Sequence, residues 1–288
     1  MKKIGFIGVG VMGKSMARNL MNAGYELQIY TRTKEKASEL INAGAKWCDT
    51  IKECVTSVDA VISIIGYPKD VEEVYLGKDG ILSFVKPGTY VIDMTTSSPN
   101  LAEKIYKAAK EKGVFALDAP VSGGDDGAKA GTLSIMVGGD EKAYNDCLEV
   151  FKFMGKTIIY EGSAGKGQHT KMANQIAIAG AISGVAEAFS YAKAKKLNLE
   201  TLFDSISMGA AASYQMQVNG KKMIQKDFEP GFFIKHFIKD LNIAAKEAKD
   251  SQLDLPILDD TLITYEKLST KGFDNLGTQA IIKEYDQE

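Results

Sequence analysis

The sequence predicts an α/β protein in two parts, in which a doubly wound, mostly parallel sheet domain is followed by an all-helical domain. Three observations support this prediction. Strand-like and helix-like runs alternate through the first half, a glycine-rich loop follows the first strand, and the second half has helical periodicity with no convincing strand. Strands that alternate with helices form a mostly parallel sheet covered by helices on both faces.

The expected strands of the first half are short apolar runs separated by turn residues. They cover residues 2–8, 26–31, 60–65, 89–94, 114–119, 132–138 and 157–162. Helices are expected over residues 12–22, 34–42, 51–56, 69–76, 100–112 and 141–154. Three helix starts carry a local signal: Thr50 with Glu53 fits a capping box, Pro99 follows Ser98 as a first-turn proline, and Asp140 stands at an N-cap position.

The pattern changes after Gly162. A single helix is expected from about residue 165 to 196, and its centre is rich in Ala, Gly and Ser, which favours close approach of neighbouring helices. Further helical runs cover residues 200–208, 214–225, 234–251 and 257–271. We therefore expect two domains, residues 1–162 and 163–288, joined by the long helix.

Composition excludes several functional classes. The chain of 288 residues is 45% hydrophobic and 25% charged with a net charge of −2, so a nucleic-acid partner is not expected. The apolar stretch 176–190 is shorter than the ~20 residues that cross a bilayer, and no membrane segment is expected. Cys48, Cys54 and Cys147 are odd in number and lack CxxC spacing, which argues against a disulfide framework or a metal site and favours the reducing cytoplasm.

The first loop has the spacing of a dinucleotide-binding turn. Gly8 permits the tight turn, Gly10 lets the backbone approach a pyrophosphate, and Gly13 allows close packing of helix and strand. A glycine-rich turn without a ligand is the alternative, but the surrounding strand and helix favour a Rossmann-type site. The expected cofactor-binding residues in this loop are Gly8, Val9, Gly10, Val11, Met12 and Gly13.

The end of the second strand bears on the choice of dinucleotide. An NAD enzyme usually carries an acidic residue there to bind the ribose 2′-hydroxyl, whereas this chain has Thr31, Arg32 and Thr33. A guanidinium can pair with a 2′-phosphate, so NADP is the expected cofactor and NAD a possible one. The alternative is a solvated arginine at the entry to a helix.

A second glycine-rich stretch, DAPVSGGDDGAKAGTLSIMVGG (118–139), follows another strand. Ligands of open α/β sheets bind beyond the carboxyl ends of strands. The hydroxyl of Ser122 and the unobstructed amides of Gly123 and Gly124 are suited to a carboxylate. A purely structural loop is the alternative.

The start of the long helix supplies the candidate acid/base. Lys171 shares a helix face with Asn174 and Gln175, and an ammonium beside amide groups can polarise a carbonyl and transfer a proton. An ordinary surface lysine is the alternative. Lys239 and Asp240 form a second, weaker pattern in front of an apolar helical run.

Taken together, the motifs resemble the β-hydroxyacid dehydrogenase family, which includes 3-hydroxyisobutyrate dehydrogenase and the tartronate, glyoxylate and succinic semialdehyde reductases. The resemblance covers essentially the whole chain: GFIGVGVMGKSMARNL, DAPVSGGDDGAKAGTLSIMVGG, GKGQHTKMANQ, and Phe232 with Lys239-Asp240. It implies that Lys171 is the general acid/base. The implied substrate-binding residues are Ser122, Gly123, Gly124, Asn174, Gln175, Phe232 and Asp240. The implied residues on the nicotinamide side are Ile65, Gly66, Asp70, Thr95 and Lys239.

The resemblance implies reversible hydride transfer between a small 3-hydroxy or 2-hydroxy carboxylic acid and its semialdehyde, in a homodimer or homotetramer. Two departures from the family pattern stand out: Ile65-Gly66 replaces Leu-Pro, and Gln175 replaces a second asparagine, which leaves open whether Asn174 or Gln175 contacts substrate. A dinucleotide-sensing protein without chemistry and an imine reductase are the alternatives. A phosphosugar substrate is not expected, because the long C-terminal extension of 6-phosphogluconate dehydrogenases is lacking.

Overall fold

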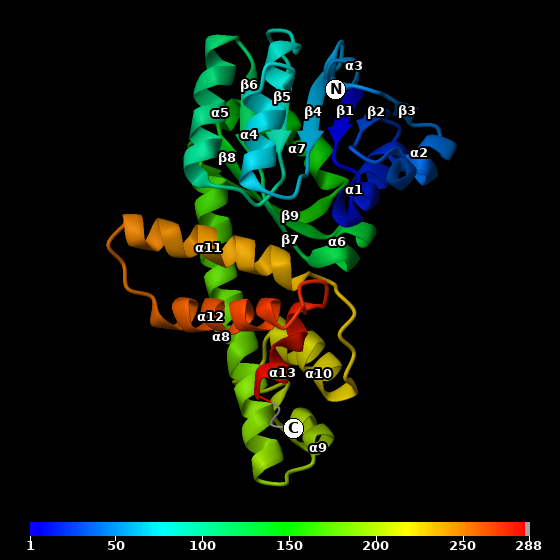
Figure 1. Ribbon diagram of the computed structural model, residues 1–288. Helices are drawn as coiled ribbons and strands as arrows, with labels where there is room; N and C mark the ends of the chain where they lie inside the picture. Colours follow the sequence, from blue (N-terminus) through cyan, green and yellow to red (C-terminus); the bar gives the residue numbers. More distant parts are fainter. Residues whose placement is uncertain (286–288) are drawn as a thin grey trace. The chain divides into compact units, whose positions relative to one another are not determined.

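The computed structural model describes residues 1–285 and divides into two compact units, residues 1–171 and the residues from 172 onward (Figure 1). The expected domain boundary after residue 162 falls at the end of the last strand, whereas the first turn and a half of the long helix belongs to the first unit. Residues 286–288, which the expected second domain includes, lie outside the described residues.

The first unit is built on one sheet. Its first six strands are parallel and lie side by side in the order β3-β2-β1-β4-β5-β6. The chain builds outward from β1 in both directions, which makes the sheet doubly wound and opens a ligand site at the carboxyl ends of β1 and β4. The strands are β1 (Lys3–Ile7), β2 (Glu26–Tyr30), β3 (Lys46–Trp47), β4 (Ala60–Ser63), β5 (Tyr90–Asp93) and β6 (Phe115–Asp118).

The sheet ends in an antiparallel part. The strands β6 and β7 (Val121–Ser122) are successive segments on either side of Ala119-Pro120, and both pair antiparallel with β8 (Leu133–Gly139). The last strand, β9 (Gly155–Gly162), is parallel to β8. Ser122 thus lies just past the carboxyl end of β6, fixed by its pairing with Ser134.

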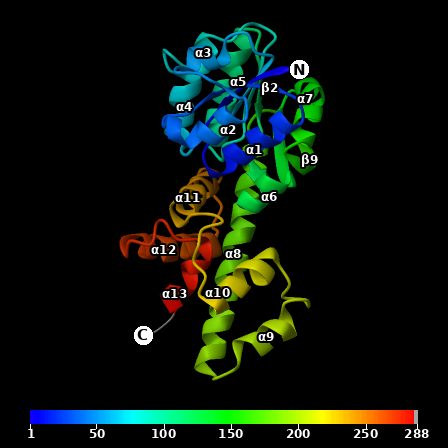
Figure 2. The same cartoon turned by 90° about the vertical axis from the view of Figure 1, so that its right-hand side faces the viewer.

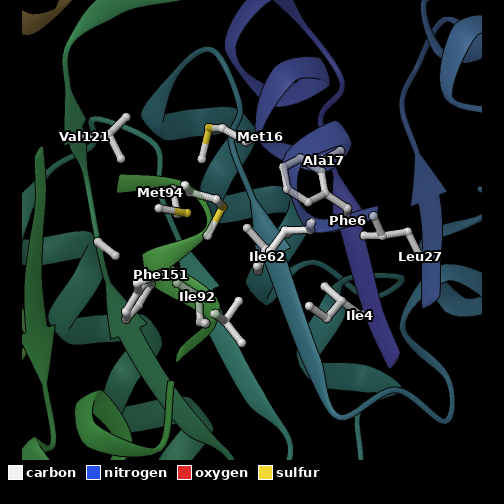
Figure 3. Close-up of a cluster of buried hydrophobic side chains, with 14 of the residues drawn as sticks. Ile4, Phe6, Met16, Ala17, Leu27, Ile62, Ile92, Met94, Val121 and Phe151 are labelled. Carbon is white, nitrogen blue, oxygen red and sulfur yellow. The ribbon is translucent and has the colours of Figure 1, made fainter. Parts of the chain in front are cut away.

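Helices cover both faces of the sheet because each strand sends alternate side chains to opposite faces. From β1, Ile4 and Phe6 join one buried cluster and Ile7 joins the other. Figure 3 shows the first cluster, in which Met16 and Phe151 lie among the strand residues. Its helices are α1 (Val11–Asn22), α2 (Ser38–Asn42), α6 (Gly124–Ala130) and α7 (Glu141–Lys152). The helices of the opposite face are α3 (Ile51–Val55), α4 (Pro68–Leu76) and α5 (Pro99–Glu111).

The second unit is helical throughout its described part. Its core includes Phe189, Phe237, Leu241 and Tyr265, and the rings of Phe237 and Tyr265 meet edge to face with centroids 5.0 Å apart. Figure 2 shows α8 as one unbroken helix. The helices are α8 (Lys166–Ala194), which starts in the first unit, α9 (Leu199–Ile206), α10 (Lys221–Gln225), α11 (Ile234–Asp250), α12 (Pro256–Thr270) and α13 (Ile282–Tyr285).

The predicted fold class is confirmed, and several short elements are additions to it. Among them are the two-residue strand β3, the helix α6 inside the second glycine-rich stretch, and the helix α13. A π-helical turn at Gln215–Gly220 begins the expected helix 214–225. Helix α6 alters the expected loop, because the chain turns helical directly after Gly123.

Three further features bear on function. No helix within residues 1–285 is both long and apolar enough to cross a membrane. In the same residues, no group of three or more His, Cys, Asp or Glu side chains is arranged to hold a metal ion. The three cysteines are free and buried.

Candidate active site

The loop between β1 and α1 can be formed only by glycine at two of its positions. Gly8 has a φ of +95°, and a Cβ there would lie 2.1 Å from the Ile64 carbonyl oxygen. A Cβ at Gly13 would lie 2.0 Å from the Gly8 carbonyl oxygen. These contacts explain the first and third glycines by packing alone.

Gly10 differs from the other two glycines because it faces open space. A Cβ at this position would meet no atom within 4 Å, and its φ of −73° is accessible to any residue. Gly10 is the N-cap of α1, no side chain caps the helix, and no acidic residue stands in its first turn. The free first-turn N–H groups and the helix dipole favour an anion here, so the loop fits the diphosphate of a dinucleotide.

The end of β2 carries the predicted cation in an exposed position. The Arg32 side chain is 77% exposed, and its Nη1 lies 3.7 Å from Oδ1 of Asp70 in the first turn of α4. Asp70, which the family resemblance assigns to the nicotinamide side, therefore lies beside the residue predicted to select the dinucleotide. Thr31 is partly buried and Thr33 exposed.

Buried hydrogen bonds connect the carboxyl ends of β4 and β5. The Ile65 N–H donates to Thr95 Oγ1 at 2.9 Å, and the Thr95 N–H donates to Asp93 Oδ1 at 3.1 Å. The same Asp93 oxygen accepts from Ser63 Oγ at 2.9 Å. Two of the predicted nicotinamide-side residues, Ile65 and Thr95, are thereby held against each other, and Gly66 follows directly.

The second glycine-rich stretch places its hydroxyl and amides where β7 meets α6. Gly123 has a φ of +132°, which a side chain would strain, and Gly124 begins the helix. Asp125 and Asp126 stand in the first turn of α6 and oppose an anion there, but Asp125 is paired with Lys129 at 2.6 Å. Ser122 is partly buried.

The start of α8 is fastened to the sheet by Asp118 and Gln168. Asp118 Oδ1 accepts from the Gly165 N–H at 2.8 Å, and Oδ2 accepts from the Gln168 N–H at 2.9 Å. The Gln168 side chain accepts from the Ser97 N–H at 2.9 Å and donates to the Thr95 carbonyl at 2.7 Å. Burial raises the pKa of Asp118 to about 6, against the lowering effect of the two backbone N–H groups.

Lys171 lies one turn beyond this attachment. It is three residues after Gln168 and therefore lies on the same side of α8. This side faces the end of β5, because the Gln168 side chain bonds the Thr95 carbonyl there. Lys171 is only 5% exposed. This burial argues against the alternative of an ordinary surface lysine. No role for Asp118 or Gln168 was predicted from the sequence. The sequence features that could have pointed to them are an acidic residue at the end of a strand and a glutamine in the first turn of the long helix.

The second unit brings together four of the predicted residues. Asn174 Nδ2 donates to Gln175 Oε1 at 2.8 Å, Gln175 Nε2 donates to Asp240 Oδ2 at 2.6 Å, and Lys239 Nζ lies 2.8 Å from Asp240 Oδ1. Gln175 and Asp240 are 2% and 1% exposed.

The predicted residue Phe232 lies just before α11, next to His236. Phe232, at 37% exposure, lies beside His236 with ring centroids 6.5 Å apart. Burial and the neighbouring ammonium of Lys239 lower the pKa of His236, so this imidazole is neutral at neutral pH. The His236 ring packs against the rings of Phe232 and Phe233. His169 is exposed.

Comparison with known proteins identifies the family of both parts of the chain. Residues 3–162 match the model of the NAD binding domain of 6-phosphogluconate dehydrogenase, and residues 165–285 match that of the NAD-binding domain of NADP-dependent 3-hydroxyisobutyrate dehydrogenase. The chain belongs to the β-hydroxyacid dehydrogenase family. It is an oxidoreductase of this family with NAD(P)-binding domains.

Several relatives cover almost the whole of this family member. An uncharacterized oxidoreductase of Bacillus subtilis, YkwC, is 53% identical over 98% of each chain. The 2-hydroxy-3-oxopropionate reductase of Escherichia coli is 39% identical over 88% of this chain and 87% of its own. The NAD-dependent L-serine dehydrogenase of Pseudomonas aeruginosa is 34% identical over 99% of this chain and 98% of its own.

Solved structures agree with this assignment. The 3-hydroxyisobutyrate dehydrogenase of Mycobacterium tuberculosis, solved with L-serine, superposes with a TM-score of 0.92 at 30% identity over the full length of both chains. An imine reductase of Streptomyces aurantiacus has a TM-score of 0.67 at 19% identity over 99% of this chain and 100% of its own, and it shares the fold alone.

Proposed function

We propose that the protein interconverts a small hydroxy carboxylic acid and its semialdehyde by NAD(P)-dependent hydride transfer, with Lys171 as general acid/base. The observation that carries the proposal is the placement of Lys171. It is buried one turn beyond the point where Asp118 and Gln168 fasten α8 to the carboxyl ends of the strands. Relatives named as acting on 2-hydroxy-3-oxopropionate and L-serine support a small substrate with a carboxylate.

The first unit supplies most of the groups that this reaction needs. The nicotinamide accepts or donates the hydride when it is bound. The amides after Gly10 hold the diphosphate, and Ile65, Gly66 and Thr95 support the nicotinamide end. Ser122 and the amides of Gly123 and Gly124 orient the substrate carboxylate, which places the reacting carbon for transfer. In the second unit, Asn174 is assigned to the substrate, Phe232 and Asp240 to the shape of the site, and Lys239 to the cofactor.

Lys171 moves the proton. In the reducing direction its ammonium donates a proton to the oxygen of the aldehyde as that oxygen gains charge, and in the oxidising direction its neutral amine takes the proton from the hydroxyl. The buried position keeps the ammonium away from bulk water, where its interaction with the developing charge would be weak.

The decisive experiment removes the Lys171 amine. We expect Lys171→Ala to lower kcat by about 10²–10⁴-fold while the dissociation constant of the dinucleotide stays within about twofold. Lys166→Ala, which changes an exposed lysine in the first turn of the same helix, is the matched control and should keep full turnover.

Substrates to assay are the tartronate, methylmalonate, succinate and glyoxylate semialdehydes. Turnover by Lys171→Ala near that of the unmodified enzyme would remove Lys171 from the mechanism. Inactivity of the unmodified enzyme toward the whole panel would favour a dinucleotide-sensing protein.

We propose NADP as the preferred dinucleotide. The support is the exposed Arg32 guanidinium and the lack of an acidic residue in the segment Tyr30–Lys34 after β2. Arg32→Asp should shift the ratio of kcat/KM for NADP over NAD toward NAD by tenfold or more, since a carboxylate repels the 2′-phosphate. An unchanged ratio would refute the role of Arg32.

We propose that the protein assembles as a homodimer or homotetramer through its helical unit. The apolar residues of helix α9, Leu199, Leu202, Phe203 and Ile206, are only partly buried against the core of the second unit, and Met208 just beyond is 80% exposed. Single chains seldom leave such a surface uncovered. Light scattering during gel filtration measures the mass directly, and a mass near 31.2 kDa at micromolar concentration would contradict the proposal.

We also propose that the protein works in the cytoplasm. The support is chemical: all three cysteines are free and buried, as expected where thiols stay reduced. Fractionation of cells with an antibody to the protein tests the location, and recovery outside the cytoplasmic fraction would contradict it.

A further inference from the structure

Four polar side chains in the second unit form a continuous row that ends at Asn174. The row begins with the ion pair between Lys239 and Asp240, passes through Gln175 and reaches the Asn174 carboxamide. Its inner members are almost fully removed from water, since Asp240 is 1% and Gln175 2% exposed. Buried polar groups of this kind are costly unless each is satisfied, so the directions of the hydrogen bonds are strongly constrained.

The charge at one end of the row sets the direction of every hydrogen bond in it. A carboxylate can only accept, so Gln175 must turn its Nε2 toward Asp240, where the two atoms lie 2.6 Å apart. The Gln175 oxygen then faces the other way and accepts from Asn174 Nδ2 at 2.8 Å. This leaves the Asn174 carboxamide in one orientation, with its nitrogen turned inward.

The outer atom of the row is therefore an acceptor. Asn174 is only partly buried, and the hydrogen bond to Gln175 uses its nitrogen, which leaves Oδ1 on the side away from Gln175. An amide that could flip would offer a donor or an acceptor to a ligand equally well. With Gln175 and Asp240 in place, Asn174 offers its oxygen, together with the second proton of its nitrogen.

Glutamine, rather than the asparagine that the resemblance leads one to expect, is required by the length of this connection. Gln175 on α8 spans from Asn174 on its own helix to Asp240 on α11. An asparagine is shorter by one methylene, about 1.5 Å. It would lose one of the two hydrogen bonds, and Asp240 would then no longer fix the orientation of the Asn174 carboxamide.

We propose that Gln175 and Asp240 are positioning residues that orient the Asn174 carboxamide. While Lys171 is an ammonium, the Asn174 oxygen accepts a hydrogen bond from the substrate hydroxyl, and in the oxidising direction that proton passes to the neutral Lys171 amine instead. Gln175 itself does not contact substrate, because both ends of its amide are already bonded. This inference rests on the proposed function, since it assigns a role within the same reaction. It predicts that the protein distinguishes a hydroxy acid from the acid of the same carbon skeleton that lacks the hydroxyl.

The test compares the binding of two acids, with 3-hydroxyisobutyrate and isobutyrate as the first pair. Each acid is measured as an inhibitor of semialdehyde reduction, which gives a dissociation constant without requiring the acid to react. In the unmodified protein the hydroxy acid should bind about tenfold more tightly, as expected for one hydrogen bond in a shielded site. In Gln175→Met and in Asp240→Asn the ratio should fall to about two or less, while the dissociation constant of isobutyrate stays within about twofold.

Asp250→Asn is the matched control. It makes the same carboxylate-to-amide change on the same helix, at an exposed residue near its end, and should leave the ratio unchanged. Equal weakening of both acids in Gln175→Met and Asp240→Asn would show a merely structural role and overturn the proposal, as would an unchanged ratio. If neither variant folds, Asn174→Ala replaces them. It removes the accepting oxygen, so the ratio should fall to about two or less, and a retained preference for the hydroxy acid would overturn the proposal.

Failure of the proposed function gives a different result. In that case the unmodified protein reduces no semialdehyde, and the rise in melting temperature with each acid replaces inhibition as the measure of binding. A larger rise with 3-hydroxyisobutyrate that disappears in Gln175→Met would still support the oriented asparagine. Equal rises with both acids would overturn it.

Discussion

The carboxylate of Asp118 holds the backbone N–H of Gln168 at 2.9 Å, and this bond joins the end of a sheet strand to the helix that carries Lys171. The first-turn N–H groups of a helix have no partner within the helix, so a buried carboxylate is an effective anchor for them. The anchor has a cost, because Asp118 is only 5% exposed and its charge is poorly solvated.

Asp118 should make the protein less stable as the pH rises from about 4 to about 6. Burial raises its pKa from the ordinary 3.8 to about 6, so between these values the folded state binds a proton that the unfolded state has released. Stability from this group is therefore complete below pH 4 and is lost through pH 6, by about 3 kcal/mol as an order of magnitude. Urea unfolding at a series of pH values measures the effect.

The variant Asp118→Asn isolates this contribution from those of other carboxylates. Subtracting its free energy of unfolding from that of the unmodified protein should leave a difference that changes steeply between pH 4 and 6. Asp254→Asn, at an exposed carboxyl, is the control and should give a flat difference. A flat difference for Asp118→Asn as well would mean that its pKa is ordinary in the folded state.

Two glycines of the first loop should respond to alanine in opposite ways. Gly13→Ala forces a Cβ to 2.0 Å from the Gly8 carbonyl oxygen and should lower the free energy of unfolding by about 2–4 kcal/mol. Gly10→Ala meets no atom within 4 Å and should cost under about 1 kcal/mol, yet raise the KM for the dinucleotide about tenfold or more. Thermal unfolding and initial rates separate the two. Normal dinucleotide affinity in Gly10→Ala would place the diphosphate elsewhere.

The pattern of apolar residues was sufficient to predict the main sheet and its helices, because burial on both faces leaves a strong periodic signal. It did not predict α6, whose sequence GDDGAKA is rich in poor helix formers. That helix depends on tertiary contacts, such as the hydrogen bond from Asn19 Nδ2 to the Ala128 carbonyl at 2.9 Å. Strand β3 is two residues long and has no periodicity to detect.

The candidate site was predictable as a set of residues but not as a set of contacts. Spacing put Lys171, Asn174 and Gln175 on one helix face, since that relation is local. The bond between Gln175 and Asp240 joins residues 65 positions apart, and the ion pair of Arg32 with Asp70 joins the loop after β2 to the first turn of α4. Such contacts depend on how elements pack, which the spacing of residues along the chain does not encode.

The Asp70 carboxylate should weaken the preference for NADP. It lies 3.7 Å from the Arg32 guanidinium and competes with a 2′-phosphate for the same cation. We expect Asp70→Asn to raise the ratio of kcat/KM for NADP over NAD by about 2–5-fold, a modest change because Arg32 is exposed and its pairing is screened by water. The control Glu72→Gln removes another exposed carboxylate of α4, one that pairs with Lys104 of α5, and should not change the ratio. A fall in the ratio for Asp70→Asn would show that Asp70 assists 2′-phosphate binding instead.

Gln168 should affect both folding and the rate of proton transfer, because its side chain bonds two backbone groups beside the predicted nicotinamide site. Gln168→Met preserves the approximate volume but leaves the Ser97 N–H and the Thr95 carbonyl without their partner in a site that is 0% exposed at Gln168. Two unsatisfied buried groups cost about 2–5 kcal/mol in the free energy of unfolding.

The effect of Gln168→Met on kcat shows whether Gln168 positions Lys171 or only stabilises the fold. If Gln168 positions Lys171, then kcat should fall about tenfold at a temperature where Gln168→Met is still fully folded, while KM for the semialdehyde changes little. Gln225→Met, at an exposed glutamine that ends α10, should leave both constants unchanged. Unchanged kcat in the folded Gln168→Met protein would mean that Lys171 keeps its position through its own helix and its remaining contacts, and that Gln168 serves only the stability of the fold.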